Sequence, residues 1–320
     1  MKFLFISLGV IFASLIIVEG GLRLFLGLGQ RPIYIADADI GYLLAPNQKI
    51  RRLGKSTIIN QYSMRSGEIE VSQATNIVRL FLLGDSLANG AWWTDQTETI
   101  SALMTQQIEK MSSQTVEVLN ASANSWGPRN QLAYLQRFGT FDAQIIILLM
   151  NTDDFFATKP TSLGVGKEKN YPDKQPSSAI GEILERFFYR PQPIPGMAEV
   201  SKEKGDRVGF NLEAVAKMKA IATQNNSQFM IVLSPLKREV ETEPKDYEKR
   251  ARKRLQDWVN THDVSFIDFL PIFQKQEQPD SLYRDHIHLS PSGNQLVSQK
   301  ISELIINDKL SDKIKDNRDN

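Results

Sequence analysis

The hydrophobic residues of this chain fall into short apolar runs that alternate with amphipathic stretches. The runs are rich in β-branched and aromatic residues, which predicts buried strands. They cover residues 77–83, 116–119, 145–150, 229–233 and 265–269. Apolar residues at helical spacing predict helices over 97–112, 132–138, 212–221, 246–258 and 291–306. This alternation predicts an α/β fold, a three-layer α/β/α sandwich with a mainly parallel sheet.

The first apolar run is different, because residues 3–18 carry no charge at all. Glu19 and Arg23 follow at a spacing that lets them pair on one face of a helix. A helix from Phe3 to Leu28 is long enough to cross a bilayer, which needs about 20 residues. We therefore expect residues 1–28 to be a single-pass signal anchor, with the rest of the chain outside the cytoplasm, either periplasmic or extracellular. A cleavable signal peptide is the alternative.

The remaining chain divides into segments of different character. Residues 29–74 are expected to form a juxtamembrane connector of short strands and turns that packs on the main domain, residues 75–306. Within that domain, residues 155–208 are rich in proline and glycine and hold one short helical stretch, 180–189. Such an insertion is typical of a lid or a substrate-recognition segment, with a merely flexible excursion as the alternative. Residues 307–320 form a polar tail.

Composition narrows the classes of function. The formal net charge of the 320 residues is +1, which gives no reason to expect nucleic acid as a partner. There is no cysteine, so disulfides, thiolate zinc sites and a cysteine nucleophile are all excluded. We predict neither a cofactor nor a bound metal.

Candidate chemistry begins where the run 77–83 ends. Gly84, Asp85 and Ser86 are turn formers, and the pattern after them is helical. Ser86 is therefore expected at a strand-to-helix turn at the carboxyl end of a strand, where open α/β sheets place their chemistry. Taken alone, a Gly-Asp-Ser tripeptide is equally typical of an ordinary turn.

A second segment, residues 283–293, offers partners for this serine. Two of the three histidines of the chain lie in it, and His288 stands three residues after Asp285. A hydroxyl nucleophile needs a base, and the base needs a carboxylate to orient it. His286 is a second candidate for the base, although a structural role is the simpler interpretation.

The Gly-Asp-Ser block and the Asp-x-x-His block together resemble the SGNH/GDSL hydrolase family over roughly residues 75 to 306. The resemblance implies an SGNH/flavodoxin-like sandwich and a serine esterase that works through an acyl-serine intermediate. It implies that Ser86 is the nucleophile, His288 the general base and Asp285 the group that orients the histidine.

The resemblance also implies an oxyanion hole, and here the chain departs from the family. Its donors are the amide of the nucleophile, Ser86, a glycine amide in a second block and an asparagine side chain in a third. Ser125 stands at the position of the glycine, which leaves the backbone donor in place. Asp153 stands at the position of the asparagine, and an ionised carboxylate cannot donate a hydrogen bond. Asn151 is the expected replacement, on the same face if the strand continues; Asn124 and a protonated Asp153 are the alternatives.

Three tryptophans lie near these blocks, Trp92, Trp93 and Trp126. They are expected either to wall an acyl or sugar site or, more commonly, to pack in the core. The expected substrate is a carboxylic ester, such as an O-acyl group on an envelope polysaccharide or a lipid. Two other functions stay open: a polysaccharide O-acyltransferase on the same scaffold, and a weakly active or non-catalytic anchored binding subunit.

Overall fold

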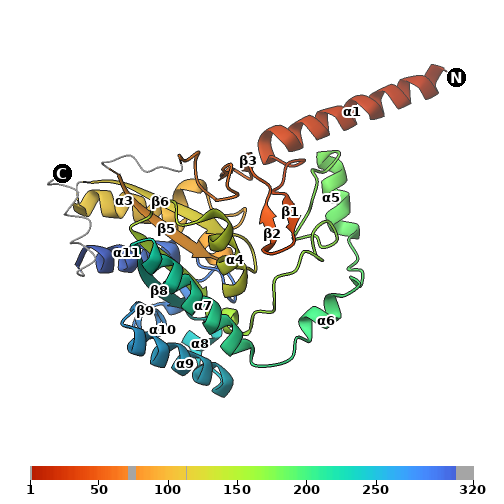
Figure 1. The fold of residues 1–320 in the computed structure, drawn as a ribbon. Coiled ribbons are helices and arrows are strands. Elements are labelled where there is room, and N and C mark those ends of the chain that lie inside the picture. Colours follow the sequence, from red (N-terminus) through yellow and green to blue (C-terminus); the bar gives the residue numbers. More distant parts are fainter. Residues whose placement is uncertain (1, 71–76, 113, 308–320) are drawn as a thin grey trace.

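The computed structural model of the protein describes residues 2–70, 77–112 and 114–307. Figure 1 shows a central sheet with helices on both faces and one long helix, α1, that projects from the domain. The sheet has five parallel strands in the order β6-β5-β7-β8-β9. They are β5 (Ile77–Gly84), β6 (Thr115–Ser122), β7 (Ile145–Asn151), β8 (Gln228–Ser234) and β9 (Ser265–Asp268). The predicted three-layer α/β/α fold and all five predicted strands are confirmed.

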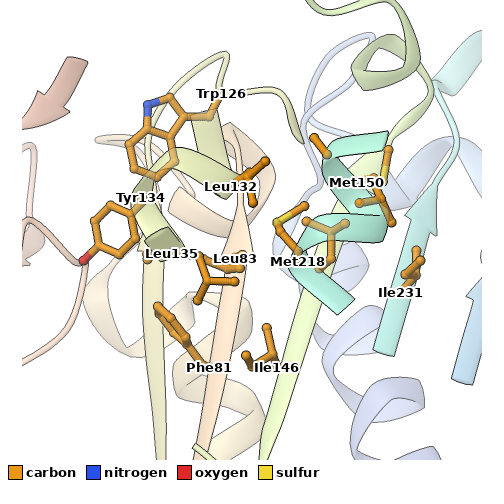
Figure 2. Close-up of a cluster of buried hydrophobic side chains, with 14 of the residues drawn as sticks. Phe81, Leu83, Trp126, Leu132, Tyr134, Leu135, Ile146, Met150, Met218 and Ile231 are labelled. Carbon is orange, nitrogen blue, oxygen red and sulfur yellow. The ribbon is translucent and has the colours of Figure 1, made fainter. Parts of the chain in front are cut away.

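Each face of the sheet has its own hydrophobic core because side chains alternate along every strand. Phe81 and Leu83 of β5 face one core, while Leu80 and Leu82 face the other. The first core, part of which Figure 2 shows, is covered by α4 (Pro128–Phe138), α7 (Arg207–Gln224) and α9 (Asp246–His262). The second is covered mainly by α3 (Ile100–Ser112) and α11 (Pro291–Asn307). These five helices are the ones that the apolar periodicity predicts.

The connector contains two antiparallel hairpins of short strands. The first pairs β1 (Tyr34–Asp37) with β2 (Gly41–Leu44), and the second pairs β3 (Gln48–Arg52) with β4 (Lys55–Ile59). Tyr34, Leu43 and Ile59 are buried in the first core, so the hairpins are part of the folded domain. The division of the chain at residues 28, 74 and 306 stays a prediction. The tail after Asn307 lies outside the described residues.

Helix α1 (Lys2–Leu26) has no buried residue, and it is the one helix among the described residues that is long and apolar enough to cross a membrane. Its carboxyl end is nevertheless bound to the domain. The Leu53 amide donates to the Leu26 carbonyl (2.8 Å), and the Gly29 amide donates to the buried Glu182 carboxylate (2.7 Å). Residues 26–29 are therefore part of the fold rather than a free linker.

The insertion after β7 contains a 3-10 turn, η2 (Thr152–Phe156), and two helices, α5 (Ala179–Phe188) and α6 (Met197–Ser201). The amides of Ala179 and Ile180 donate to the Glu19 carboxylate of α1 at 2.8 and 2.9 Å, and Ser178 caps α5. Arg52 forms a buried ion pair with Glu182. Helix α5 is therefore docked on α1 and on the β3–β4 hairpin, while the role of the insertion stays a prediction. The other short elements are α2 (Ser86–Asn89), η1 (Gln96–Glu98), α8 (Lys237–Glu241), α10 (Leu270–Gln274) and η3 (Pro279–Leu282).

Candidate active site

Ser86 lies where strand β5 turns into α2. Asp85 caps this short helix, since its Oδ1 accepts a hydrogen bond from the Leu87 amide (2.8 Å). A Cβ at position 84 would stand 2.6 Å from the Cβ of Ala88, so only glycine fits at the end of the strand. The helix expected after Ser86 is a single turn, because Gly90 takes a left-handed conformation (φ 72°) and ends it.

The sheet order places Ser86 at a topological switch point. Strand β5 lies between β6 and β7, and the chain leaves β5 toward β6 before it crosses to β7 on the other side. The loops after the three strands therefore separate above the end of β5 and leave a crevice there. A cavity of about 940 Å³ occupies this region, at the upper end of the range for ligand pockets, and Ser86 lines it.

The structure brings Ser86, His288 and Asp285 into one hydrogen-bonded line. The distance from His288 Nε2 to Ser86 Oγ is 3.0 Å, and the distance from His288 Nδ1 to Asp285 Oδ2 is 2.8 Å. Because the carboxylate can only accept, Nδ1 carries the imidazole proton and Nε2 is left to accept from the serine hydroxyl. This arrangement can withdraw a proton from Ser86 as its oxygen attacks a carbonyl carbon.

The loop that carries Asp285 and His288 is held by its own backbone and by its neighbours. Asp285 Oδ1 accepts from the amides of Ile287 (3.0 Å) and His288 (2.8 Å), and the Arg284 amide donates to the His288 carbonyl (2.8 Å). The Lys237 amide donates to the His286 carbonyl and ties the loop to α8 (3.0 Å). Partial burial acts to raise the pKa of Asp285, but these amides and the His288 ring lower it below the ordinary aspartate value. The carboxylate is thereby kept in the ionised form.

The imidazole of His288 packs against Trp93, and Trp93 packs against Arg284. The indole of Trp93 meets the His288 ring edge to face, with ring centroids 5.0 Å apart. The Arg284 guanidinium in turn lies over the Trp93 ring, 4.9 Å from the ring centre. His286 makes no such contacts; its side chain is 83% exposed and 3.9 Å from Asp285. Ser86 is thus hydrogen-bonded to His288 and not to His286, and the structural role expected for His286 stays a prediction.

The tryptophans divide between site and core. Trp92 and Trp93 line the cavity, whereas Trp126 is buried in the first core and donates from Nε1 to the Tyr42 carbonyl (3.0 Å). Trp92 and Trp93 therefore wall the site, as one expectation had it, and Trp126 packs in the core, as the other had it.

Ser125 takes up the backbone conformation that the glycine position suggests. Its φ is 58°, in the left-handed region that costs a residue with a side chain about 1 kcal/mol. The side chain is exposed and lines the cavity, and within the described part of the chain its amide donates to no protein acceptor. The amide is thus available to a bound group.

The asparagine Asn151 ends strand β7 next to Ser86. Its Nδ2 donates to Asp85 Oδ2 (2.8 Å), its Oδ1 accepts from the Asp153 amide (2.7 Å), and its own amide donates to the buried Asp154 carboxylate (2.9 Å). The second hydrogen on Nδ2 has no acceptor among the described residues, and Asn151 lines the cavity. The amide group is therefore fixed in orientation with one donor to spare.

The pKa values of the two buried carboxyl groups beside Asn151 are both raised. Burial raises the pKa of Asp85 to about 6, although the Leu87 amide and His288 oppose the shift. Burial and the Asp85 charge raise the pKa of Asp154 well above its ordinary value. Both carboxyl groups are hydrogen-bonded to Asn151, Asp85 through the side-chain amide and Asp154 through the backbone amide.

The alternative oxyanion residues are placed less well. The strand does not continue past Asn151, so Asp153 lies in η2 rather than on the same strand face, and its side chain is exposed at the cavity wall. Desolvation and the carboxylates of Glu248 and Glu239 raise the pKa of Asp153. Asn124 lines the cavity, but its Oδ1 is buried without a hydrogen-bond partner among the described residues.

One buried side chain that shapes the site has no sequence motif. Arg65 is almost fully buried, and its guanidinium donates to the carbonyls of Asn89, Ala91 and Thr94. These carbonyls belong to the loop that carries the two cavity tryptophans. A lone arginine in a connector gives no signal in a sequence, since its partners are backbone atoms.

A sheet with a serine, histidine and aspartate joined at its carboxyl edge defines a serine hydrolase of the α/β class. The model of the GDSL-like Lipase/Acylhydrolase family matches residues 82–296, about two thirds of the chain. The chain belongs to this family, also called SGNH hydrolases, and is a serine esterase or acylhydrolase.

Several solved structures of low identity are similar to part of this chain. A member of the lipolytic G-D-S-L family from Veillonella parvula is 11% identical (TM-score 0.46), with 72% of this chain and 99% of that chain covered. The lipase/acylhydrolase from Enterococcus faecalis is 15% identical (TM-score 0.44; 71% and 94% covered). A catalytic mutant of Axe2, an acetylxylan esterase from Geobacillus stearothermophilus, is 10% identical (TM-score 0.47; 71% and 92% covered). A comparison with curated proteins gives no significant match.

Proposed function

We propose that this protein is a membrane-anchored serine esterase that cleaves a carboxylic ester through an acyl-serine intermediate. The observation that carries the proposal is the unbroken line of hydrogen bonds from Ser86 through His288 to Asp285. Ser86 Oγ attacks the ester carbonyl while His288 Nε2 takes its proton. His288 then returns this proton to the leaving alcohol, and water attacks the acyl-serine in the second half of the reaction.

The developing oxyanion is bound by the amides of Ser86 and Ser125 and by the free hydrogen on Asn151 Nδ2. The fixed orientation of Asn151 and the left-handed turn at Ser125 support this assignment. Loss of one such donor typically costs about 10²–10³ in rate. Asp153 is not the preferred donor, because its side chain is exposed in η2 and a carboxylate, when ionised, only accepts hydrogen bonds.

The anchor is helix α1, retained in the mature protein, and the catalytic domain lies outside the cytoplasm. Hydrogen bonds from the domain to Glu19 and Leu26 support retention, because a cleavage after residue 26 would remove groups that the fold uses. The expected substrate is an acyl ester on an envelope glycan or a lipid.

Transfer of the acyl group to a sugar hydroxyl is the second candidate function. The cavity volume of about 940 Å³ favours it, since such a space can hold an acyl group and an acceptor together. In transfer, the acceptor hydroxyl replaces water in the attack on the acyl-serine.

The test is stopped-flow hydrolysis of p-nitrophenyl acetate by the full chain in detergent. We expect a burst of one nitrophenolate for each protein, followed by slower turnover, and no burst from Ser86→Ala. Turnover that rises with added oligosaccharide, together with acylated sugar, would identify a transferase. Absence of a burst and of turnover in the wild type would leave only the anchored binding subunit.

A further inference from the structure

Helix α5 packs with the opposite polarity to a helix of a water-soluble domain. Its apolar side chains, Ile180, Ile183, Leu184, Phe187 and Phe188, recur at spacings that place them on one face. Its polar side chains occupy the other face, which is the one turned to the protein. An amphipathic helix normally buries the apolar face and leaves the polar one in water.

The polar face of α5 is bound to the domain by ion pairs between side chains. Glu182 is completely buried and paired with Arg52, while Glu185 pairs with Arg31 at 3.2 Å. Glu185, Arg186 and Tyr189 line the cavity that contains Ser86. The polar face is therefore bound to the domain through Glu182 and Glu185, and it lines the mouth of the active site.

The apolar face of α5 is exposed to solvent over its carboxyl-terminal half, from Leu184 to Phe188. Phe187 is 80% exposed and Phe188 is 77% exposed. Among the described residues, every large hydrophobic side chain that is at least 70% exposed lies on α1 or α5. Exposed apolar area of this kind, gathered in one place, marks an interaction surface.

The position of α5 indicates what covers this face. Its amino end is capped by Glu19, directly after the uncharged part of α1. Figure 1 shows α5 on the side of the domain from which α1 projects, lying across the direction of α1. Leu24 and Phe25 of α1 and Leu53 of the β3–β4 turn are exposed beside the same junction. We call Leu24, Phe25, Leu53, Leu184, Phe187 and Phe188 the apolar collar of α1.

We propose that α5 is an interfacial helix, with the apolar collar inserted into the bilayer leaflet from which α1 emerges. Interfacial helices place their apolar face about 5–10 Å into the boundary between headgroups and acyl chains. The cavity mouth, lined by the opposite face of α5, then opens at the headgroup level. Resting on the proposed esterase function, this position makes the preferred substrate an ester carried by a membrane lipid rather than a freely soluble one.

The first experiment measures contact with lipid and needs no activity. The chain has no cysteine, so Phe187→Cys and Phe188→Cys each give a single site for an environment-sensitive dye. The labelled full chain is placed in nanodiscs of phosphatidylethanolamine and phosphatidylglycerol, with or without brominated acyl chains. Phe12→Cys on α1 is the control for a position inside the bilayer, and Met111→Cys, exposed at the end of α3, is the control for a position in water.

We expect the dyes on α5 to lose roughly half of their fluorescence to brominated lipid, as an inserted position should, and the dye at position 111 to lose none. Quenching at 187 and 188 no greater than at 111 would overturn the proposal. Cross-linking of α5 between two copies without lipid quenching would overturn it as well and would make the collar a dimer surface.

The second experiment tests the substrate class with the double variant Phe187→Glu/Phe188→Glu. Neither residue lines the cavity. We expect hydrolysis of an ester in phospholipid vesicles to fall about tenfold, as the loss of two buried phenyl groups allows, while p-nitrophenyl acetate is hydrolysed at the wild-type rate. Equal rates on the vesicle ester would overturn the substrate assignment. A wild type inactive on both esters would instead refute the esterase function and leave the quenching result unaffected.

Discussion

The imidazole of His288 makes two hydrogen bonds at once, to Ser86 and to Asp285, and the second fixes which ring nitrogen is protonated. Asp285→Asn replaces an acceptor with a group that can donate, which favours the wrong tautomer. We expect this substitution to lower kcat for p-nitrophenyl acetate by about 10²–10⁴ while KM changes little. The measurement is steady-state kinetics beside circular dichroism, which should show an unchanged fold. A loss of less than threefold would show that Asp285 does not orient the base.

Ser125 holds a left-handed conformation that glycine adopts without strain. We expect Ser125→Gly to raise the free energy of unfolding by up to about 1 kcal/mol, because the strain is removed and the backbone donor is kept. Ala133→Gly, in the middle of α4, is the matched control and should lower it by about 1 kcal/mol. Urea unfolding in detergent measures both. Destabilisation by glycine at position 125 would contradict the strain that the backbone implies.

The pKa of Asp85, raised to about 6, gives a pH dependence of known sign. The folded state holds the Asp85 proton more tightly than the unfolded state, so this contribution to stability is present below about pH 4 and is lost as the pH rises to about 6. Asp85→Asn is neutral throughout, and its melting temperature should fall less than that of the wild type between pH 4 and pH 7. Thermal unfolding in detergent at several pH values is the measurement. An equal or larger fall in the variant would contradict the raised pKa.

The sequence predicts the side chains of the candidate site only where they belong to a recognisable motif. The blocks around Ser86 and His288 are short and local, so their spacing points to the residues that meet. The contacts of Arg65, Arg52 and Trp93 could not be predicted, because their partners are backbone carbonyls or residues far along the chain. Asn151 was expected on a continuing strand, whereas the cap formed by its own side chain begins η2 there.

At the scale of elements, the buried ion pair of Arg52 and Glu182 holds α5 to the β3–β4 hairpin. Burial acts to raise the pKa of Glu182, but the hydrogen bonds from Arg52 and the Gly29 amide lower it, so the carboxylate is ionised. Glu182→Ala leaves Arg52 buried without its partner and should cost about 3–5 kcal/mol. We expect faster proteolysis within residues 179–190, compared with Glu213→Ala on the exposed face of α7. Equal cleavage rates would show that the pair does not hold α5.

The long elements followed directly from their patterns, since strands such as β7 are buried throughout and read as unbroken apolar runs. Short elements did not. The single turn α2 ends at Gly90. The residues after it form a loop whose carbonyls accept hydrogen bonds from Arg65. The docking of α5 could not be predicted either, because its polar side chains pair with arginines of the connector while Phe187 and Phe188 on its apolar face are exposed.

At the scale of the whole molecule, α1 and the domain form one folded unit through Glu19, Leu26 and Gly29. We therefore expect the mature protein to keep its first 30 residues. Intact mass spectrometry of the membrane fraction should give the full-length mass, and carbonate washing should leave the protein in the pellet. A soluble product shortened after the apolar run would show that α1 is a cleaved signal.

The central claim is that Ser86 is made nucleophilic by His288, and labelling with a fluorophosphonate tests it most directly. The account predicts one phosphonyl group for each protein, located by mass spectrometry on the peptide that contains Ser86. Labelling should be at least 10²-fold slower in His288→Ala, as expected when a general base is lost, and unchanged in His286→Ala. Labelling at another serine, or at an equal rate without His288, would contradict it.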